Sequence, residues 1–150
     1  SHGEFVANSG LIVNPIYRKA GLAKAIKFKI FELSRTKYPD AKIFGLTTGL
    51  AVMKINSELG YEPVTYSQLT QDENFWKGCQ SCVNYDILMS KGRQNCMCTA
   101  MLYDPEDKRI QEEERLKKIT KKATLLERIE AKLRNSLKMV TVNLFRTQNA

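Results

Sequence analysis

A strand that passes into a helix near the N-terminus limits the folds open to this chain. Residues 5–13, FVANSGLIV, are rich in β-branched and apolar types, which predicts a strand with an irregularity near Gly10. Pro15 ends this strand, and apolar residues from Leu22 to Tyr38 then recur at helical spacing. A second strand over residues 43–47 and a second helix in GLAVMKINSELGYEP repeat the alternation.

Two further strands complete the predicted globular part. They are VTYSQL, residues 64–69, and VNYDILM, residues 83–89, with a polar turn or short helix around TQDENFW between them. Strands that alternate with helices predict an α/β or α+β fold with a mixed central sheet. At least one right-handed crossover helix should join parallel strands of that sheet.

The last third of the chain differs from the rest in composition and in the spacing of its apolar residues. After Pro105 there is neither glycine nor proline, and apolar residues recur at spacings of three and four, which predicts one long amphipathic helix. The repeat consists of Leu116, Ile119, Ala123, Leu126, Ile129, Leu133, Leu137 and Val140. The expected domains are therefore a globular part, residues 1–104, and a helical tail, residues 105–150.

Charge and hydropathy limit the classes of ligand and partner expected for this chain. The net charge is +8, of which residues 105–150 carry +5, so the globular part is only mildly basic and suits a small phosphate-bearing ligand. The tail mixes both signs and has one aromatic residue, Phe145, so base stacking and hence nucleic acid are not expected. The tail is expected to pack on the globular part or to pair with a partner helix, with homodimerisation preferred; contact with an anionic surface and partial disorder are the alternatives. No apolar run approaches a membrane span, and no secretory leader is present, so a cytoplasmic location is expected.

The segment RKAGLA stands where the first strand passes into the first helix. A helix N-terminus carries unpaired N–H groups and a partial positive charge, both of which attract phosphate. Arg18 and Lys19 add positive charge, and Gly21 lets the backbone approach a ligand closely. The segment is thus a candidate pyrophosphate cradle, although a basic first turn with an incidental glycine has the same sequence.

The order strand, V-x-P-x-Y-R-x-x-G-x-A, helix, strand, and helix ending in ELGYEP resembles the GNAT superfamily of acyl-CoA-dependent N-acyltransferases. Arg18, Gly21 and Ala23 match the R/Q-x-x-G-x-G/A phosphate loop of that family, and Gly60-Tyr61 matches the end of its late helix. The resemblance covers residues 4–90 and corresponds to the C-terminal half of the fold. FVANSGLIV, KIFGLTTGLAVMKINSELGY and WKGCQSCVNYDIL are similar to a bacterial branch associated with arginine-biosynthesis gene clusters.

The resemblance implies transfer of an acetyl or similar acyl group from acyl-CoA to a primary amine, such as an amino acid. The amine would attack the thioester directly within a ternary complex. The backbone of Leu11, Ile12 and Val13 would bind the pantetheine arm and the thioester. The pyrophosphate would bind at Arg18, Lys19, Ala20, Gly21, Leu22 and Ala23, and Asn56 would add a hydrogen bond to the cofactor.

Two departures from the family leave the catalytic residues unknown. Asn56 stands where many members have the tyrosine that protonates the CoA thiolate, and an amide cannot act as a titrating acid. Asn56 and Tyr61 remain weak candidates; Tyr66 and Tyr85 are more readily core or strand aromatics, and His2 could be a base but is terminal.

The family's first three strands and first two helices are also missing from this chain. We therefore expect a truncated N-terminus, with little or no turnover unless another chain completes the sheet. A homodimer formed through that missing half of the fold is one arrangement that would do so. The alternative is a non-catalytic module that binds acyl-CoA or a partner.

Four cysteines occur within one short stretch. Cys79, Cys82, Cys96 and Cys98 have the number and pairing of an all-cysteine zinc site, with a redox C-x-x-C pair or incidental thiols as alternatives. If residues 83–89 and 98–103 pair as a hairpin, Cys82 lies roughly 13 Å along the strand from the residue opposite Cys98. That separation is too large for one metal ion, so the predicted hairpin argues against zinc.

Overall fold

A computed structural model of the chain describes the backbone of residues 4–147 and the side chains of residues 4–134. His2 and the side chains of Leu137 and Val140 lie outside these described residues. The chain divides into two units, residues 1–106 and 107–150, which are treated separately.

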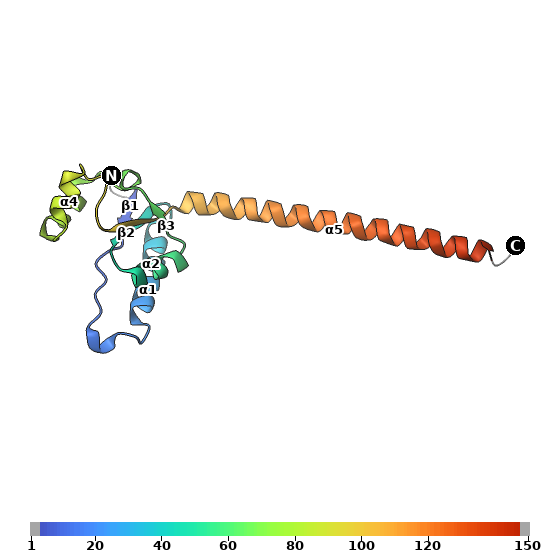
Figure 1. Ribbon diagram of the computed structural model, residues 1–150, viewed down its shortest axis with the longest axis horizontal. Coiled ribbons are helices and arrows are strands. Elements are labelled where there is room, and N and C mark those ends of the chain that lie inside the picture. The colour runs from blue at the N-terminus through green and yellow to red at the C-terminus, as the bar shows by residue number, and fades with distance from the viewer. Residues whose placement is uncertain (1–3, 148–150) are drawn as a thin grey trace. The chain divides into compact units, whose positions relative to one another are not determined.

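The first unit is a mixed α+β fold built on one four-stranded sheet (Figure 1). Its strands are β1 (Phe5–Ala7), β2 (Lys42–Thr47), β3 (Glu62–Val64) and β4 (Thr99–Tyr103). Their order in the sheet is β1-β2-β4-β3. β1 pairs with β2 in parallel, and β4 pairs antiparallel with β2 and β3, so the expected mixed sheet is confirmed.

Helices and short 3-10 turns connect the strands. The α-helices of this unit are α1 (Leu22–Lys37), α2 (Leu50–Glu58), α3 (Glu73–Lys77) and α4 (Tyr85–Ser90). The 3-10 turns are η1 (Pro15–Tyr17), η2 (Tyr66–Gln68) and η3 (Gly78–Ser81). α1 forms the expected crossover between the parallel strands β1 and β2.

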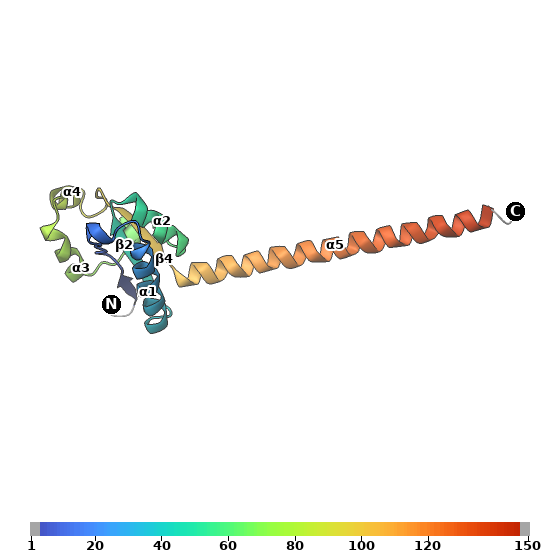
Figure 2. The same ribbon diagram turned by 90° about the horizontal axis from the view of Figure 1, so that it is seen from below.

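The sheet buries apolar side chains on both faces because successive strand residues point to opposite sides. Ile43 and Met101 pack with Tyr61 and with residues of α1 and α2. Phe44 and Leu102 face the other way and pack with residues contributed by the segment from η2 to α4. In two perpendicular views, α1 and α2 lie apart from α3 and α4 (Figures 1 and 2).

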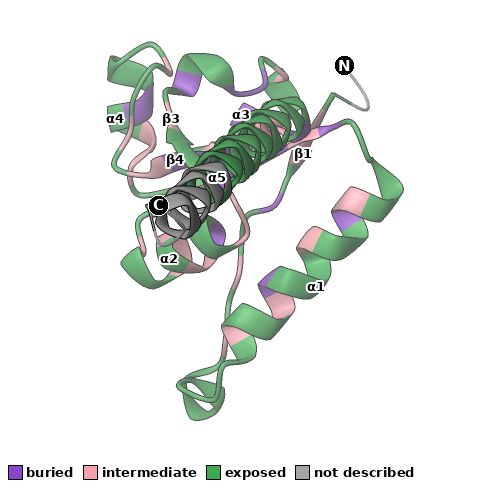
Figure 3. Cartoon of the chain, turned by 90° about the vertical axis from the view of Figure 1, so that its right-hand side faces the viewer, coloured by how far each residue is buried: buried purple, intermediate pink, exposed green. Residues whose placement is uncertain are grey.

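α1 packs on the sheet through an unexpected row of residues. Its buried residues are Lys27 and Ser34, and Phe31 between them contacts the rings of Tyr61 and Tyr103, with ring centroids 5.7 and 4.9 Å apart. The apolar residues Leu22, Ile30 and Leu33 are instead exposed, and most of α1 faces solvent (Figure 3). The helix was therefore predicted correctly from apolar spacing, although that spacing does not mark the face that packs.

Three predicted strands need correction. β1 ends at Ala7, so residues 8–13 are not part of a strand. The strand predicted at 64–69 is wrong, because β3 ends at Val64 and a 3-10 turn follows. The strand predicted at 83–89 is also wrong: α4 occupies this segment, and β4 has both edges paired, with β2 and β3. No edge of β4 is left for the predicted hairpin.

The described part of the second unit is a single helix. α5 runs from Pro105 to Thr147, which confirms the predicted long C-terminal helix. Side chains of its apolar repeat, among them Leu116, Leu126 and Leu133, are about half exposed within this unit.

Candidate functional site

The sheet opens between β1 and β2. Asn8 N donates to Phe44 O at 2.7 Å and extends the parallel ladder by one bond beyond β1. In a continued parallel ladder, the next bond would join Leu46 N to Asn8 O. Lys27 Nζ donates to Asn8 O instead, at 2.5 Å, and the chain turns away at Gly10, whose φ is +80°. The buried lysine thus occupies the acceptor at which the pairing ends.

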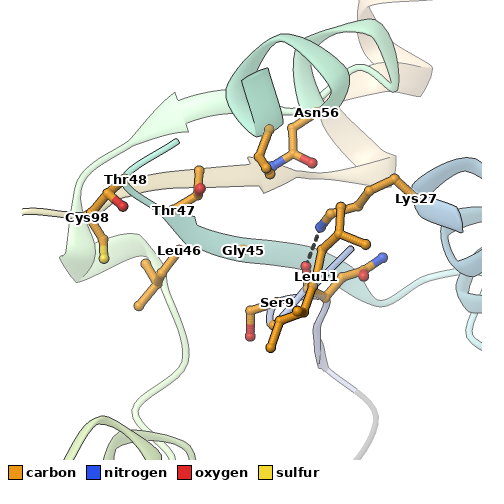
Figure 4. A pocket seen from close by; sticks show the side chains of 13 residues that line it. Ser9, Leu11, Lys27, Gly45, Leu46, Thr47, Thr48, Asn56 and Cys98 are labelled. Atoms are coloured by element: carbon orange, nitrogen blue, oxygen red, sulfur yellow. Dashed lines mark hydrogen bonds between the residues drawn. The ribbon is translucent and has the colours of Figure 1, made fainter. Parts of the chain in front are cut away.

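A cavity of about 240 Å³ lies in this opening. Its walls are the segment after β1 and the C-terminal part of β2 with the turn that follows. α1 and α2 contribute one or two residues each, and Cys98 lies just before β4. The lining residues are Asn8, Ser9, Gly10, Leu11, Ile12, Lys27, Gly45, Leu46, Thr47, Thr48, Val52, Asn56 and Cys98. Figure 4 shows Lys27 reaching in from α1 and Asn56 from α2, both on the same side of the part of β2 that contains Gly45.

Gly45 allows this close arrangement. A Cβ at this position would lie 3.1 Å from Asn8 O and 3.9 Å from Asn56 Nδ2. A larger residue would therefore push directly against the carbonyl that Lys27 holds.

Buried polar groups concentrate here. Lys27 is only 3% exposed, and burial lowers the pKa of its ammonium group. Asn56 is 1% exposed; its Nδ2 lies 3.7 Å from Met101 Sδ, and its Oδ1 has no hydrogen-bond partner. Asn8 Nδ2 is likewise buried without a partner. Such atoms cost free energy in a folded protein, and a bound ligand would supply the missing partners.

Tyr61, one of the weak catalytic candidates, lies in the core beside the cavity and does not line it. Burial raises its pKa, and its hydroxyl lies near Asn8 without a well-formed hydrogen bond. Tyr66 donates its hydroxyl to Cys98 O at 2.8 Å and packs in the core on the other face of the sheet. Tyr85 packs at the edge of that same core. Neither of these two tyrosines lines the cavity between β1 and β2.

The candidate pyrophosphate loop is exposed and lies outside this cavity. Gly21 caps α1 with φ +76°, and α1 begins at Leu22 with no acidic residue in its first turn. Arg18 Nε donates to Val13 O at 2.9 Å, which joins the loop to the segment after β1. Of the predicted cofactor-binding residues, the structure gathers Leu11, Ile12 and Asn56 in the cavity, and it leaves Val13 and residues 18–23 outside.

Sequence reasoning missed Asn8 and Lys27. Lys27 stands four residues before Phe31 and seven before Ser34, so it belongs to the row of α1 that packs on the sheet. A lysine in that row was the available signal. The apolar row through Leu22, Ile30 and Leu33 concealed it.

The four cysteines gather around a second cavity, and Cys98 borders both this cavity and the one between β1 and β2. Their side chains are free thiols that line one small cavity of about 30 Å³, together with Leu46, Tyr66, Asn84, Tyr85 and Leu88. Burial raises the pKa of Cys79 and of Cys98, and neighbouring thiols raise both further. No three Cys, His, Asp or Glu side chains of the described residues are arranged to hold a metal ion. The separation argued from a hairpin no longer applies, because residues 85–90 are helical.

Comparisons with protein-family models, with curated proteins and with solved structures found no match to this chain. Within the described residues, no helix has the length and apolar character needed to cross a membrane.

Proposed function

We propose that this chain is the cofactor-binding part of a GNAT-like N-acyltransferase. It would transfer an acetyl or similar acyl group from acyl-CoA to a primary amine, such as an amino acid. The observation that carries the proposal is the opening of the parallel pair β1–β2 at Asn8, with a cavity between the two diverging segments. The family resemblance expects the pantetheine arm at the same segment, residues 11–13.

The free backbone of this segment supports the proposal. Residues Ser9–Ile12 lie outside every strand and helix and line the cavity, so their N–H and C=O groups can pair with the amides of a pantetheine arm. The orphan Asn56 Oδ1 is an acceptor for a donor on the same ligand. The ligand would thus satisfy buried groups that the protein leaves unpaired.

The basic loop supports binding of the phosphates. Residues 18–22 are exposed, Arg18 and Lys19 are cationic, and the N–H groups of the first turn of α1 have no side-chain cap. The bond from Arg18 to Val13 O makes this loop continuous with the cavity segment. An extended cofactor would therefore have its arm at one end of residues 9–23 and its pyrophosphate at the other.

Calorimetry with acetyl-CoA tests the proposal. Gly21→Glu puts an anion at the N-terminus of α1, and we expect it to weaken binding at least about tenfold, which is ~1.4 kcal/mol. Gly92→Glu is the matched control, because Gly92 also has a positive φ, +56°, and open space within 4 Å of the position that a Cβ would take. Equal affinities for wild type and Gly21→Glu would remove the proposal.

A second candidate function is acyl-CoA binding without turnover. Among the described residues no Asp, Glu, His or Tyr side chain lines the cavity; its titratable side chains are Lys27, which already donates to Asn8 O, and Cys98. Release of CoA thiol in the presence of acetyl-CoA and a panel of amino acids separates the two candidates. Binding with no thiol release favours the non-catalytic module.

A further inference from the structure

We propose that Cys79, Cys82, Cys96 and Cys98 bind one structural zinc ion. The four thiols come from two chain segments, one at η3 and one just before β4, and all four border the same 30 Å³ cavity. Four thiols around one point are the ligand set of a closed tetrahedral zinc site. This inference does not depend on the proposed acyltransferase function.

The local backbone already supports two of the sulfur atoms. Cys82 N donates to Cys79 O at 2.9 Å and closes a tight turn between the two cysteines of the C-x-x-C pair. Asn84 N donates to Cys82 Sγ at 3.5 Å, and the Cys96 thiol donates to Asn84 O at 3.8 Å. The N–H directed at Cys82 favours the thiolate that a metal requires, whereas the carbonyl holds Cys96 as a thiol until a metal displaces its proton; Asn84 thus contacts a sulfur atom of each pair.

The chemistry of the four sulfur ligands determines which metal ion the site would bind. All four candidate ligands are sulfur, and no oxygen or imidazole ligand borders the cavity among the described side chains other than the Asn84 amide and the tyrosine hydroxyls. Soft thiolates in fourfold arrangement select zinc or iron over magnesium and calcium. As they stand the sulfur atoms do not hold a metal, so binding requires each to move toward a Zn–S distance of about 2.3 Å. Rotation about Cα–Cβ bonds, with adjustment of the exposed Cys82 loop, provides such movement.

A metal ion at this place would stabilise the long connection between β3 and β4. β3 and β4 are hydrogen-bonded neighbours, yet the chain between them runs through residues 65–98 and contains only short helices. Long connections with little regular structure lose much conformational entropy when they fold. A metal that joins residues 79 and 82 to residues 96 and 98 would close this connection near its end and hold it against the sheet.

Metal analysis of the full chain, purified without chelators, is the direct test. We expect about one zinc per chain, as for a single tetrahedral site. Cys82→Ser and Cys96→Ser should each lose most of the zinc. Met97→Ser is the matched control, because Met97 lies between two of the cysteines, is exposed and carries no thiol. Fluorescence of Trp76, the only tryptophan, reports whether each variant is folded.

Cobalt keeps the test informative if the serine variants do not fold. Wild-type protein refolded with Co²⁺ and a reductant should show the thiolate charge-transfer and tetrahedral bands of a four-sulfur site. Three results would each overturn the proposal: stoichiometric iron in place of zinc, two disulfides in protein prepared with a reductant, or wild-type protein with neither zinc nor the cobalt bands. Retention of zinc in both serine variants would also overturn it.

Discussion

Replacement of Asn56 by leucine should make the protein more stable and a poorer binder. Asn56 is almost fully buried on α2, its Oδ1 has no partner, and its Nδ2 has only the thioether of Met101 at 3.7 Å. A buried acceptor without a partner costs about 1–3 kcal/mol, whereas a hydrogen bond to sulfur returns little. Leucine removes both polar atoms, and the adjoining 240 Å³ cavity gives its larger side chain room.

The net gain in the free energy of unfolding should be about 1 kcal/mol, or roughly 4–8 °C in Tm for a domain of this size. Urea denaturation followed by Trp76 fluorescence measures it, since Trp76 is buried and its Nε1 donates to Thr70 O at 2.9 Å. Acetyl-CoA affinity should fall at least about tenfold in the same variant. Asn74→Leu, at an exposed position of α3, is the control and should change neither quantity appreciably. A less stable Asn56→Leu protein, or one with unchanged affinity, would refute the reasoning.

Three further predictions concern the opening of the sheet and the tail. Burial lowers the pKa of Lys27 from 10.5, so on raising the pH the folded protein releases this proton before the unfolded chain does. The stability of the wild type relative to Lys27→Met should therefore rise with pH between the folded-state pKa and 10.5. Denaturation of both proteins at pH 7 and pH 10 measures this difference, and a smaller difference at pH 10 would contradict the prediction. Gly45→Ala places a Cβ 3.1 Å from Asn8 O and should destabilise the protein by about 1 kcal/mol, whereas Gly78→Ala has open space and should not; equal midpoints in urea would count against the close contact. If α5 pairs with a second copy along the repeat that contains Leu126, Leu126→Asp should give a monomer by light scattering, while Leu125→Asp, equally exposed but outside the repeat, should not.

Local sequence patterns predicted the regular elements well where one pattern dominates. α1, α2 and α5 follow apolar spacing with glycine or proline at their ends, and β2 is a short run of buried apolar residues. The errors fall where tertiary pairing decides the structure. Residues 8–13 have strand composition, but Lys27 takes the acceptor that would continue the ladder. Residues 83–89 have strand composition too, but both edges of the available strand, β4, are already paired.

The candidate site was only partly predictable for the same reason. Asn56, Leu11 and Ile12 were named from the family pattern, and they do meet in one cavity. Asn8 and Lys27 stand in no motif, and they become visible only when the packing row of α1 is known. The cysteines were noticed by count, but their gathering around one cavity depends on a helix, α4, that composition did not predict.

Several buried polar groups of this fold lie together at one end of the β1–β2 pair. A lysine is buried there, two side-chain amides keep orphan atoms, and the adjacent backbone leaves the sheet after a single extra hydrogen bond. Elsewhere in the first unit the core clusters are apolar and aromatic, although Ser34 and Thr70 are also buried and Arg35 Nη1 and Tyr61 Oη also lack a partner. Folding alone would favour a continued ladder with Leu46 N on Asn8 O and an apolar residue in place of Lys27, because no ammonium group would then be buried to satisfy that carbonyl. Retention of these groups at one place is what a ligand that enters the ladder would require, and an extended molecule with amide groups along its length is the kind of ligand that can take the place of a strand.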